Sequence, residues 1–331
     1  MADKKTTLAE IAQQLGISKI TVSRALKGQP GVGDTLRKHV CDVAEELGYE
    51  QQRLRTPARR RRFVFITPKR FFLATDSFYH VIYYDLATLC HAHDTDLQVL
   101  ILEKDQESSG TLPTELVGAD GIFIGGEIAK PAMDAVARTG IPVVVIDYYV
   151  TDEAVDCVVI DNYMVGAVAA EYLVRKGYRK IGFVGSYQQS SNIADRINGY
   201  LKIVRREGLP FQDDWIINNY DPKMDNYILD ISLPEEMPQA FICHCDRAAY
   251  YFIEKLKSMN IQIPEQVAII SIDNTDLAQA CTPPLSSINI DKQAFATQAF
   301  HLLEERLKER HVARKVYLET EIIPRASAPG I

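Results

Sequence analysis

The sequence predicts an N-terminal all-α helix-turn-helix domain followed by a larger α/β domain built from two Rossmann-like lobes. Three observations support this fold class. Apolar residues recur at helical spacing three times within the first 49 residues. From residue 63 onward, short apolar runs of strand length alternate with helical segments. The alternation starts again near residue 181, which indicates a second lobe.

The first two helices are separated by a short turn that contains a glycine. The apolar residues of segment 8–15 share one helical face, and Gly16 then ends the helix in the position of a left-handed turn residue. Ser18 can cap a second helix, whose inner face carries Val22 and Leu26. A third helical segment follows a glycine-rich loop. This arrangement is typical of a helix-turn-helix.

The outer face of the second helix carries hydroxyl and cationic side chains. Both suit phosphate oxygens, and an arginine also suits the two acceptors of guanine in the major groove. A plain three-helix bundle would explain the apolar stripes but not this outer face. We therefore predict a DNA-binding surface that comprises Thr7, Ser18, Lys19, Ile20, Thr21, Ser23, Arg24 and Lys27.

The run TLAEIAQQLGISKITVSRAL, residues 7–26, resembles the lactose-repressor (LacI/GalR) family of bacterial transcription regulators. The likeness rests on Gly16, Ser18 and the TVSR of residues 21–24, and it continues to Tyr49. The rest of the chain has the length and element order of that family's ligand domain. The resemblance implies a periplasmic-binding-protein fold there. It also implies a homodimer that binds a near-palindromic operator in double-stranded DNA.

The resemblance divides the chain into three parts. It implies a helix-turn-helix domain over residues 1–49, a basic hinge or linker over 50–62, and an effector-binding and dimerisation domain over 63–331. The last part would contain a first lobe of about 63–160 and 291–318, and a second lobe of about 161–290 and 319–331. The chain would cross between the lobes three times, near residues 160, 290 and 320.

The linker EQQRLRTPARRRR departs from the hinge of that family. The family's hinge starts with Pro-Asn and forms a short helix whose leucine enters the minor groove. Here Gln51 and Gln52 replace that pair, and Pro57 disfavours helix at the residue before it. Two interpretations stay open. The segment is a solvated tether, or its arginines bind phosphates or a narrow minor groove, namely Arg59, Arg60, Arg61 and Arg62.

The apolar runs of the α/β domain predict parallel strands that are buried on both faces. Strands are predicted over 63–67, 97–102, 121–126, 143–147 and 157–161 in the first lobe, and over 181–185, 215–219, 240–245 and 267–273 in the second. Helices are predicted over 78–93, 132–139, 164–176 and 194–207, and one ends at residue 259. The segment 286–290, a helix over 291–310 and one last strand over 315–324 complete the chain.

Polar and aromatic residues that follow the strands are candidates for an effector site, because ligands of open α/β sheets bind beyond the carboxyl ends of the strands. Carboxylates and guanidinium groups bind paired hydroxyls, and aromatic rings cover the C–H faces of a sugar. The predicted effector-binding residues are Phe78, Tyr79, Asp147, Arg196, Tyr220, His244, Asp246 and Asp273.

The family resemblance supports some of these assignments more than others. Arg196 and Asp273 match its effector positions, and its aromatic ligand-stacking positions match Phe78, Tyr79 and Tyr220. Structural alternatives remain: Asp147, Asp161 and Asp246 could be helix caps or strand-end turns, and the two residues at 78 and 79 could be plain core. Cys245 stands where the family has an asparagine that often contacts sugars, so the ligand need not be a simple hexose.

The charge is divided between the two ends of the chain. Residues 1–62 hold 13 Lys and Arg against 7 Asp and Glu, whereas the remaining residues hold 24 against 37. A basic module on an acidic body concentrates polyanion binding at one end. The acidic balance of the whole chain therefore does not argue against DNA binding.

The cysteines and the hydropathy place further limits on function. Six cysteines are scattered, and the one close pair, Cys243 and Cys245, lacks a second pair at zinc-finger spacing, so we expect reduced thiols and no metal or cofactor. No apolar run has the length of a membrane span and no signal peptide opens the chain. We therefore expect a cytoplasmic protein.

Together these observations predict a sequence-specific transcriptional repressor controlled by a small polar effector, expected to be a sugar or sugar derivative, in the cleft between two lobes. The alternative effector is a nucleobase or another metabolite. An enzyme is disfavoured because no catalytic motif is present, and because His91 and His93 do not share a helix face. A solute-binding transport protein is disfavoured by the helix-turn-helix.

Overall fold

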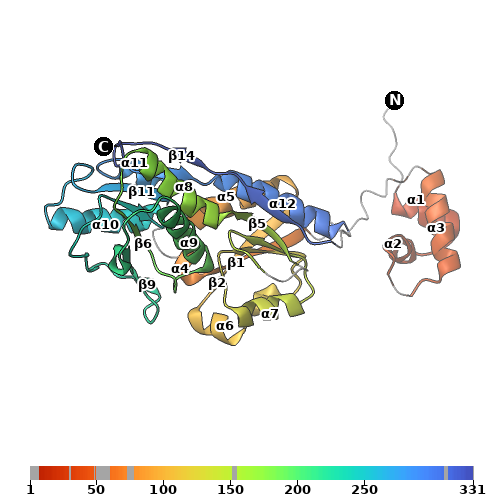
Figure 1. The fold of residues 1–331 in the computed structure, drawn as a ribbon. Coiled ribbons are helices and arrows are strands. Elements are labelled where there is room, and N and C mark those ends of the chain that lie inside the picture. The colour runs from red at the N-terminus through yellow and green to blue at the C-terminus, as the bar shows by residue number, and fades with distance from the viewer. Residues whose placement is uncertain are drawn as a thin grey trace, which may run out of the picture. The chain divides into compact units, whose positions relative to one another are not determined.

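The computed structural model describes residues 7–29, 31–47, 49, 60–72, 78–150, 155–308 and 312–330. They belong to two compact units, Met1–Arg60 and Arg61–Ile331, and each unit is described by itself (Figure 1). None of the described helices combines the length and the apolar character that crossing a membrane requires.

The described residues of the N-terminal unit form three helices, α1 (Leu8–Leu15), α2 (Lys19–Leu26) and α3 (Asp34–Glu46). A capping box between Thr7 and Glu10 starts α1, and Gly16 ends it with φ of 65°. The hydroxyl of Ser18 starts α2 by accepting a hydrogen bond from the backbone N–H of Thr21 at 3.0 Å. These caps confirm the predicted roles of Gly16 and Ser18, and the helices meet around a small apolar core.

The larger unit contains two six-stranded sheets. The first sheet is parallel and has the order β13 (Lys315–Leu318), β5 (Asp156–Ile160), β4 (Val143–Ile146), β3 (Gly121–Gly125), β1 (Arg61–Pro68) and β2 (Thr95–Leu102). One face of it packs against α5 (Phe78–Ala92) and α12 (Lys292–Leu307), and the other packs against α7 (Lys130–Arg138).

The second sheet has the order β14 (Glu321–Ile323), β12 (Ser286–Asn289), β11 (Ala268–Asp273), β10 (Ala240–Cys243), β6 (Ile181–Val184) and β7 (Ile216–Ile217). It is parallel except at β14, which pairs with β12 in the antiparallel sense. One face packs against α8 (Asn162–Arg175) and α9 (Ser191–Arg206), and the other packs against α10 (Asp246–Ser258). The predicted two-lobed α/β architecture is therefore confirmed.

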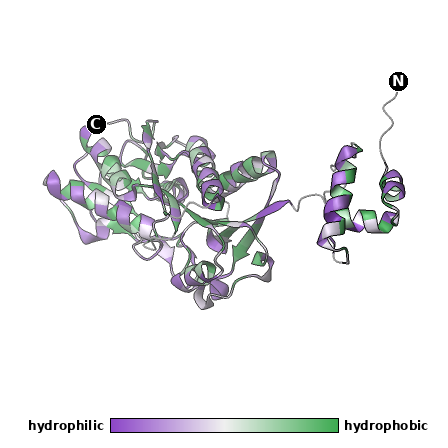
Figure 2. Cartoon of the chain, turned by 90° about the vertical axis from the view of Figure 1, so that its right-hand side faces the viewer, coloured by the Kyte–Doolittle hydropathy of each residue, from purple (hydrophilic) through white to green (hydrophobic). Residues whose placement is uncertain are grey.

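The side chains of β1 show why its sequence is continuously apolar. Phe63 and Phe65 join the core beneath α5 and α12, whereas Val64 and Ile66 join the core on the α7 side. Successive residues of a strand point to opposite faces, so a strand covered on both faces needs apolar side chains at every position. Figure 2 shows the hydrophobic strands inside the larger unit and hydrophilic residues on its helices.

The structure also contains short elements that the apolar pattern did not predict. They are α4 (Lys69–Phe72), α6 (Lys104–Ser109), α11 (Asp276–Ala280), the 3₁₀ turns η2 (Thr114–Leu116) and η3 (Asp213–Trp215), and a hairpin of β8 (Tyr220–Asp221) and β9 (Asn226–Tyr227). The predicted strand over 215–219 is reduced to the two residues of β7. Short polar segments carry little periodicity, which explains why they were missed.

The prediction of one last strand over 315–324 is wrong. The segment forms two strands in different sheets, β13 in the first and β14 in the second. Together with the connections from β5 to α8 and from β12 to α12, this gives the three passages between the lobes that the family resemblance implies. A single short apolar run can thus supply one strand to each lobe.

The first strand begins at Arg61 rather than at residue 63, so the predicted linker was two residues too long. Arg62 donates hydrogen bonds to Gln98 and to the backbone oxygens of Glu115 and Val117, and Arg61 pairs with Glu304 at 2.6 Å. Both guanidinium groups are engaged within the larger unit, which removes the support for their predicted DNA contact. Residues 50–59, with Arg59 and the hinge question, lie outside the described residues.

Helices α8 and α9 approach each other unusually closely. A Cβ atom on Gly199 would lie 1.9 Å from the carbonyl oxygen of Tyr163, and one on Gly166 would lie 1.9 Å from that of Arg196. Only glycine allows two backbones to approach this closely. This crossing brings Arg196 of α9 next to the first residue of α8.

Candidate functional site: a helix face and an interlobe cavity

Helix α2 presents the polar side chains predicted to bind DNA. Lys19, Arg24 and Lys27 are exposed, and Thr21 and Ser23 are partly buried at its flank. Ile20 is 67% exposed, which is unusual for a branched apolar side chain and suits contact with a thymine methyl group. Val22 and Ala25 point into the core, so the polar and apolar faces of this short helix are separate.

A second site lies in the larger unit, as a cavity of about 120 Å³ that side chains of both lobes line. The structure brings seven of the eight predicted effector residues to this cavity, namely Phe78, Tyr79, Asp147, Arg196, Tyr220, His244 and Asp273. They come from elements that are far apart in the sequence. Most of them lie near the carboxyl end of a strand or the start of the next element, whereas Arg196 lies in the second turn of α9.

Sequence reasoning missed twelve of the nineteen lining residues. The additional residues are Arg70, Phe71, Glu127, Gln189, Ser190, Asn192, Ile193, Asp225, Asn226, Tyr227, Cys245 and Arg247. Several also follow strands, such as Glu127 after β3 and Arg70 in the short helix after β1, so the strand-end rule could have found them. Asp225 and its neighbours belong to the unpredicted hairpin.

Asp147 is held in the cavity wall at the end of β4. Its side chain is only 6% exposed, and Oδ2 accepts a hydrogen bond from the hydroxyl of Tyr79 at 2.7 Å. Burial raises the pKa of Asp147 to about 6, against the opposing effects of the nearby Arg196 and of the Tyr79 hydrogen bond. This carboxyl group therefore titrates close to physiological pH.

Arg196 links three parts of the second lobe. Its Nε donates to Oδ1 of Asn162 at 2.7 Å, and its Nη1 donates to the backbone oxygen of His244 at 2.5 Å. Burial, with a smaller contribution from Arg196, lowers the pKa of His244 to about 3. The imidazole is therefore neutral and can only offer one donor and one acceptor to a ligand.

Asp273 is the last residue of β11 and has a backbone conformation that favours glycine, with φ of 102°. The ammonium group of Lys292 donates to its backbone oxygen at 2.7 Å, which ties this strand end to the start of α12. A non-glycine residue with positive φ is strained and is often found at a functional site. The position agrees with the predicted role of Asp273 in ligand binding.

The assignment of Asp246 to the effector site is wrong. Its two carboxylate oxygens accept hydrogen bonds at 2.6–2.9 Å from the hydroxyls of Ser271, Ser287 and Thr275 and from the backbone N–H of Thr275. The side chain is 1% exposed and is not part of the cavity lining. Asp246 instead joins the start of α10 to β11 and β12, and Cys245 caps that helix.

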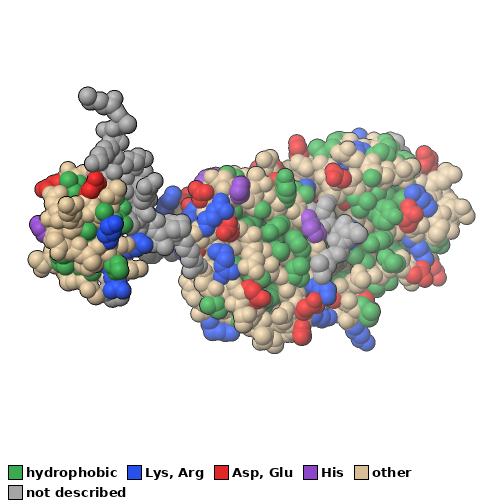
Figure 3. Space-filling view, turned by 180° about the vertical axis from the view of Figure 1, so that it is seen from behind, with side chains coloured by type: hydrophobic (Ala, Val, Ile, Leu, Met, Phe, Trp, Pro, Cys, Tyr) green, Lys and Arg blue, Asp and Glu red, His purple; other side chains and the backbone are tan. Residues whose placement is uncertain are grey.

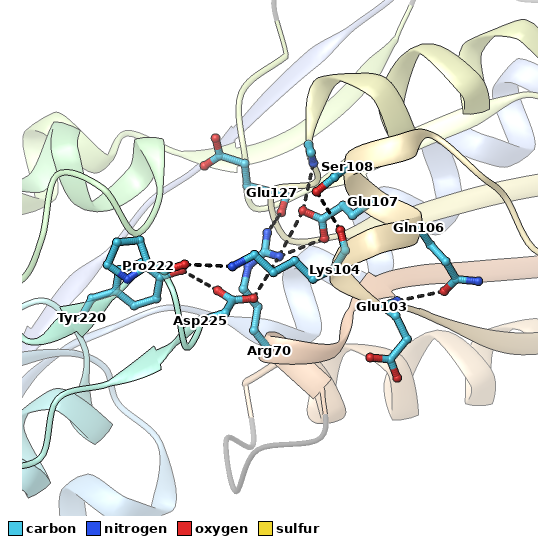
Figure 4. A network of polar contacts seen from close by, with 11 residues as sticks. Arg70, Glu103, Lys104, Gln106, Glu107, Ser108, Glu127, Tyr220, Pro222 and Asp225 are labelled. Atoms are coloured by element: carbon cyan, nitrogen blue, oxygen red, sulfur yellow. Dashed lines mark hydrogen bonds and ion pairs between the residues drawn. The ribbon is translucent and has the colours of Figure 1, made fainter.

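A network of polar contacts connects the two lobes at the cavity (Figure 4). Arg70 of the first lobe pairs with Glu107 at 2.9 Å, donates to the backbone oxygen of Glu127 at 2.7 Å, and lies 3.8 Å from Asp225 of the second lobe. Tyr220 donates to Asp225 across the hairpin. The hairpin of the second lobe is thereby held against the first lobe.

Two further contacts cross between the lobes. Lys104 of α6 donates to the backbone oxygen of Pro222 in the hairpin at 2.8 Å. The carboxylate of Glu127 accepts from the backbone N–H and the hydroxyl of Ser191 at 2.7 and 2.8 Å, at the N-terminus of α9. A carboxylate is stabilised at this position by the free N–H groups and the dipole of the helix. These contacts would have to break for the lobes to separate.

The cysteines do not form a reactive centre in the part of the chain that the structure describes. None of the six forms a disulfide among the described residues. Burial raises the pKa of Cys243, of Cys157 and, to about 11, of Cys281. No group of three or more His, Cys, Asp or Glu side chains that could hold a metal ion occurs among the described residues.

Comparison with known protein families covers both units. Residues 7–52 match the family described as bacterial regulatory proteins, lacI family. Residues 170–328 match the family described as periplasmic binding protein-like domain.

The chain is similar over its length to curated bacterial proteins named HTH-type transcriptional repressor PurR. The protein from Vibrio campbellii is 24% identical over 334 residues, which cover 96% of this chain and 97% of that protein. The protein from Pasteurella multocida is 24% identical over 331 residues, which cover 97% of this chain and 98% of that protein. These relatives are regulators and not enzymes.

Solved structures share the fold. The transcriptional regulator CelR in complex with cellobiose matches with a TM-score of 0.69 and 21% identity, over 98% of this chain and all of that one. CcpA of Lactococcus lactis matches with a TM-score of 0.70 and 18% identity, over 81% of this chain and all of that one. CcpA from Weissella paramesenteroides with bound glucose matches with a TM-score of 0.66 and 19% identity, over 82% and 99%.

The helix-turn-helix, the two-lobed α/β unit and these matches lead to the same conclusion, and the predicted family and regulatory function are confirmed. The chain combines a DNA-binding domain of the lacI family with a periplasmic binding protein-like domain, and it is a DNA-binding transcriptional repressor.

Proposed function

We propose that a small polar effector in the interlobe cavity controls how tightly this repressor binds its operator. The observation that carries the proposal is that both lobes line one cavity and bond to each other across it, through Arg70 and Asp225 and through Glu127 and Ser191. A molecule bound there contacts both lobes at once. It therefore has unequal affinity for closed and open lobe arrangements, which is the condition for controlling a distant site.

Each lobe of the proposed mechanism contains one of the two six-stranded sheets. The first comprises about residues 61–160 and 291–318, and the second about 161–290 and 319–331. Three connections join them, so the lobes can rotate about these connections without breaking either sheet. Lobe rotation would change the spacing of two DNA-binding domains attached to a dimer, and with it the fit to two half-sites.

We propose a carbohydrate as the effector class. Asp147, Arg196 and Asp273 offer charged partners for hydroxyls, and the rings of Phe78, Tyr79 and Tyr220 are available to cover C–H faces. Two of the structural neighbours hold cellobiose and glucose, respectively. A nucleobase is the second candidate, because the nearly parallel rings of Tyr227 and His244, 5.9 Å apart, offer a flat surface.

We propose that α2 enters the major groove, where Arg24 reads a base while Thr21 and Ser23 hold phosphates. Arg59 and Arg60 would add contacts to the backbone or to the minor groove next to it. Phosphate contacts position a protein on DNA, and base contacts give it sequence preference.

The active form is proposed to be a homodimer in the cytoplasm, bound to a near-palindromic operator. One helix-turn-helix makes few contacts, and a two-fold protein presents one α2 to each half-site. The larger unit exposes apolar surface for such an interface. Tyr84 of α5 is 70% exposed and Tyr250 of α10 is 39% exposed. Figure 3 shows hydrophobic side chains among charged ones on the face of this unit that it views.

Operator binding with and without candidate effectors tests this function. Fluorescence anisotropy would follow the full chain on DNA from upstream of its own gene, with cellobiose, glucose, ribose and adenine as effectors. The expected result is sequence-specific binding whose Kd one of these molecules changes at least tenfold. Sequence-specific binding that responds to none of them would contradict the proposed control by the cavity.

A further inference from the structure

The most informative atom in the cavity is Oδ1 of Asp147, which has no hydrogen-bond partner among the described residues. Its sister atom Oδ2 accepts from Tyr79 at 2.7 Å. The side chain is almost completely buried, and a buried carboxylate oxygen that accepts no hydrogen bond is unfavourable. Asp147 is part of the cavity lining, so a ligand there can supply the missing donor.

The backbone of Asp147 keeps the side chain in this place. Its φ is 67°, a left-handed conformation that aspartate tolerates better than most residues. Its N–H donates to the oxygen of Val158 at 2.9 Å, and its own oxygen accepts from the amide of Asn192 in the other lobe. The carboxyl group is thus presented to the cavity by bonds on both sides of the residue.

The charges around Asp147 do not favour an anionic ligand. The described lining contains three arginines and four carboxylates, namely Arg70, Arg196 and Arg247 against Glu127, Asp147, Asp225 and Asp273. Arg70 already pairs with Glu107, and Arg196 already donates to Asn162 and His244. His244 is neutral, and the arginines do not outnumber the carboxylates, so the described lining has no excess of positive charge for a phosphate or carboxylate.

We infer that the effector is an uncharged molecule that donates a hydrogen bond to Oδ1 of Asp147, and that anionic derivatives of the same molecule bind more weakly. The inference rests on the proposed effector role of the cavity and narrows its ligand class. Hydroxyl groups of sugars and amino groups of nucleobases are donors of this kind.

The inference predicts how the affinity for the effector changes with pH. Burial raises the pKa of Asp147 to about 6 without ligand. A donor stabilises the carboxylate, so the pKa of Asp147 falls when the ligand binds, and the ligand binds most tightly above pH 6. For a neutral ligand, Kd should be about tenfold higher at pH 5 than at pH 7.5, because most of Asp147 is protonated at the lower pH. A ligand that accepts from a protonated Asp147 would show the opposite trend.

Titration calorimetry with the full chain tests the inference. The neutral probes are glucose, cellobiose, ribose and adenine, and the anionic counterparts are glucose 6-phosphate, glucuronate and ribose 5-phosphate. We expect at least one neutral probe to bind, with its anionic counterpart at least tenfold weaker and with the pH trend above. Asp147→Asn keeps the size of the side chain and should weaken the probe at least tenfold at pH 7.5 and flatten its pH profile.

Asp134→Asn is the matched control, because the side chain of Asp134 on α7 is 46% exposed and pairs with Lys130. It should leave affinity and pH profile unchanged, and melting curves of both variants would show whether they remain folded. The inference is overturned if no neutral probe binds, if an anionic probe binds more tightly than its neutral counterpart, or if the affinity rises toward pH 5. A neutral probe that binds as expected without changing operator affinity would support the inference and contradict the proposed control of DNA binding.

Discussion

The two proposed sites of this chain offer different kinds of side chain to their ligands. Helix α2 carries hydrogen-bond donors on its exposed surface, and Arg24 is an example. The interlobe cavity offers buried side chains fixed by bonds to their neighbours, and Arg196, which is 5% exposed, is typical of these. An exposed flexible arginine can adapt to a long polyanion, whereas a fixed buried one selects a small molecule by shape. Substitutions should therefore affect one site without affecting the other.

The largest effect is expected from a substitution that disrupts the close contact between α8 and α9 in the larger unit. Gly199→Val would place a side chain against the backbone of Tyr163, where even a Cβ would lie at 1.9 Å. We expect the free energy of unfolding of the larger unit to fall by about 3 kcal/mol, at the upper end for overpacking. Asn198→Val puts the same side chain on the exposed face of α9 and should be nearly neutral. Denaturant unfolding of the fragment 61–331 would measure both, and equal stabilities would contradict the close helix contact.

The next effect removes a ligand contact and leaves the fold in place. Asp273→Asn keeps the shape of the side chain and tolerates the positive φ of residue 273. Effector binding should weaken by about 1.5–3 kcal/mol, or one to two decades in Kd, as expected when a charged hydrogen bond is removed. Arg196→Ala should weaken it similarly but also lower the melting temperature, because Arg196 braces Asn162 and His244. Calorimetry that finds parental affinity for the Asp273 variant would remove this residue from the site.

A substitution on α2 should show the reverse pattern. Arg24→Ala should cost about 1–3 kcal/mol of specific operator affinity and relax the preference at one base position. Lys27→Ala, the matched cationic control, should weaken all DNA sequences about equally. Binding curves on a set of mutated operators separate the two outcomes. Equal weakening of all sequences by Arg24→Ala would contradict its base-reading role.

The smallest effect is expected at the boundary between the linker and the larger unit. Replacing Arg59 and Arg60 with Gln should flatten the slope of log K against log salt by about 0.9 for each phosphate that the protein no longer neutralises. Replacing Arg61 and Arg62 should leave that slope unchanged and lower the stability of the larger unit instead, because both are engaged within it. A salt titration of operator binding compares the two pairs. Equal slopes for both pairs and the parent would mean that the linker is only a tether.

The same comparison explains what the sequence could predict. The helix-turn-helix is local, since one short continuous segment contains its caps, its turn and its polar face, and the structure has Gly16 and Ser18 in their predicted roles. The cavity depends on contacts between residues that are distant in the sequence, such as Lys104 and Pro222. The strand-end rule found seven of its residues but not the hairpin, which has too few residues to show a period.

The two errors have physical reasons as well. Asp246 follows a strand, as the other candidates do, but the hydroxyls on two neighbouring strands, Ser271 and Ser287, turn it into a buried structural acceptor. The last apolar run was predicted as one strand, because periodicity cannot show that residues 315–318 and 321–323 join different sheets. Both depend on which strands are neighbours, and local sequence does not contain that information.

The central claim is that α2 and the cavity are separate sites joined by a change in lobe arrangement. The most direct test is operator affinity with and without the effector identified by calorimetry, measured by fluorescence anisotropy for the parent, Arg24→Ala and Asp273→Asn. The account predicts that Asp273→Asn binds the operator like the parent but loses the response to effector. It predicts that Arg24→Ala binds the operator weakly but still binds effector with parental affinity. An Asp273→Asn protein that responds like the parent would contradict it.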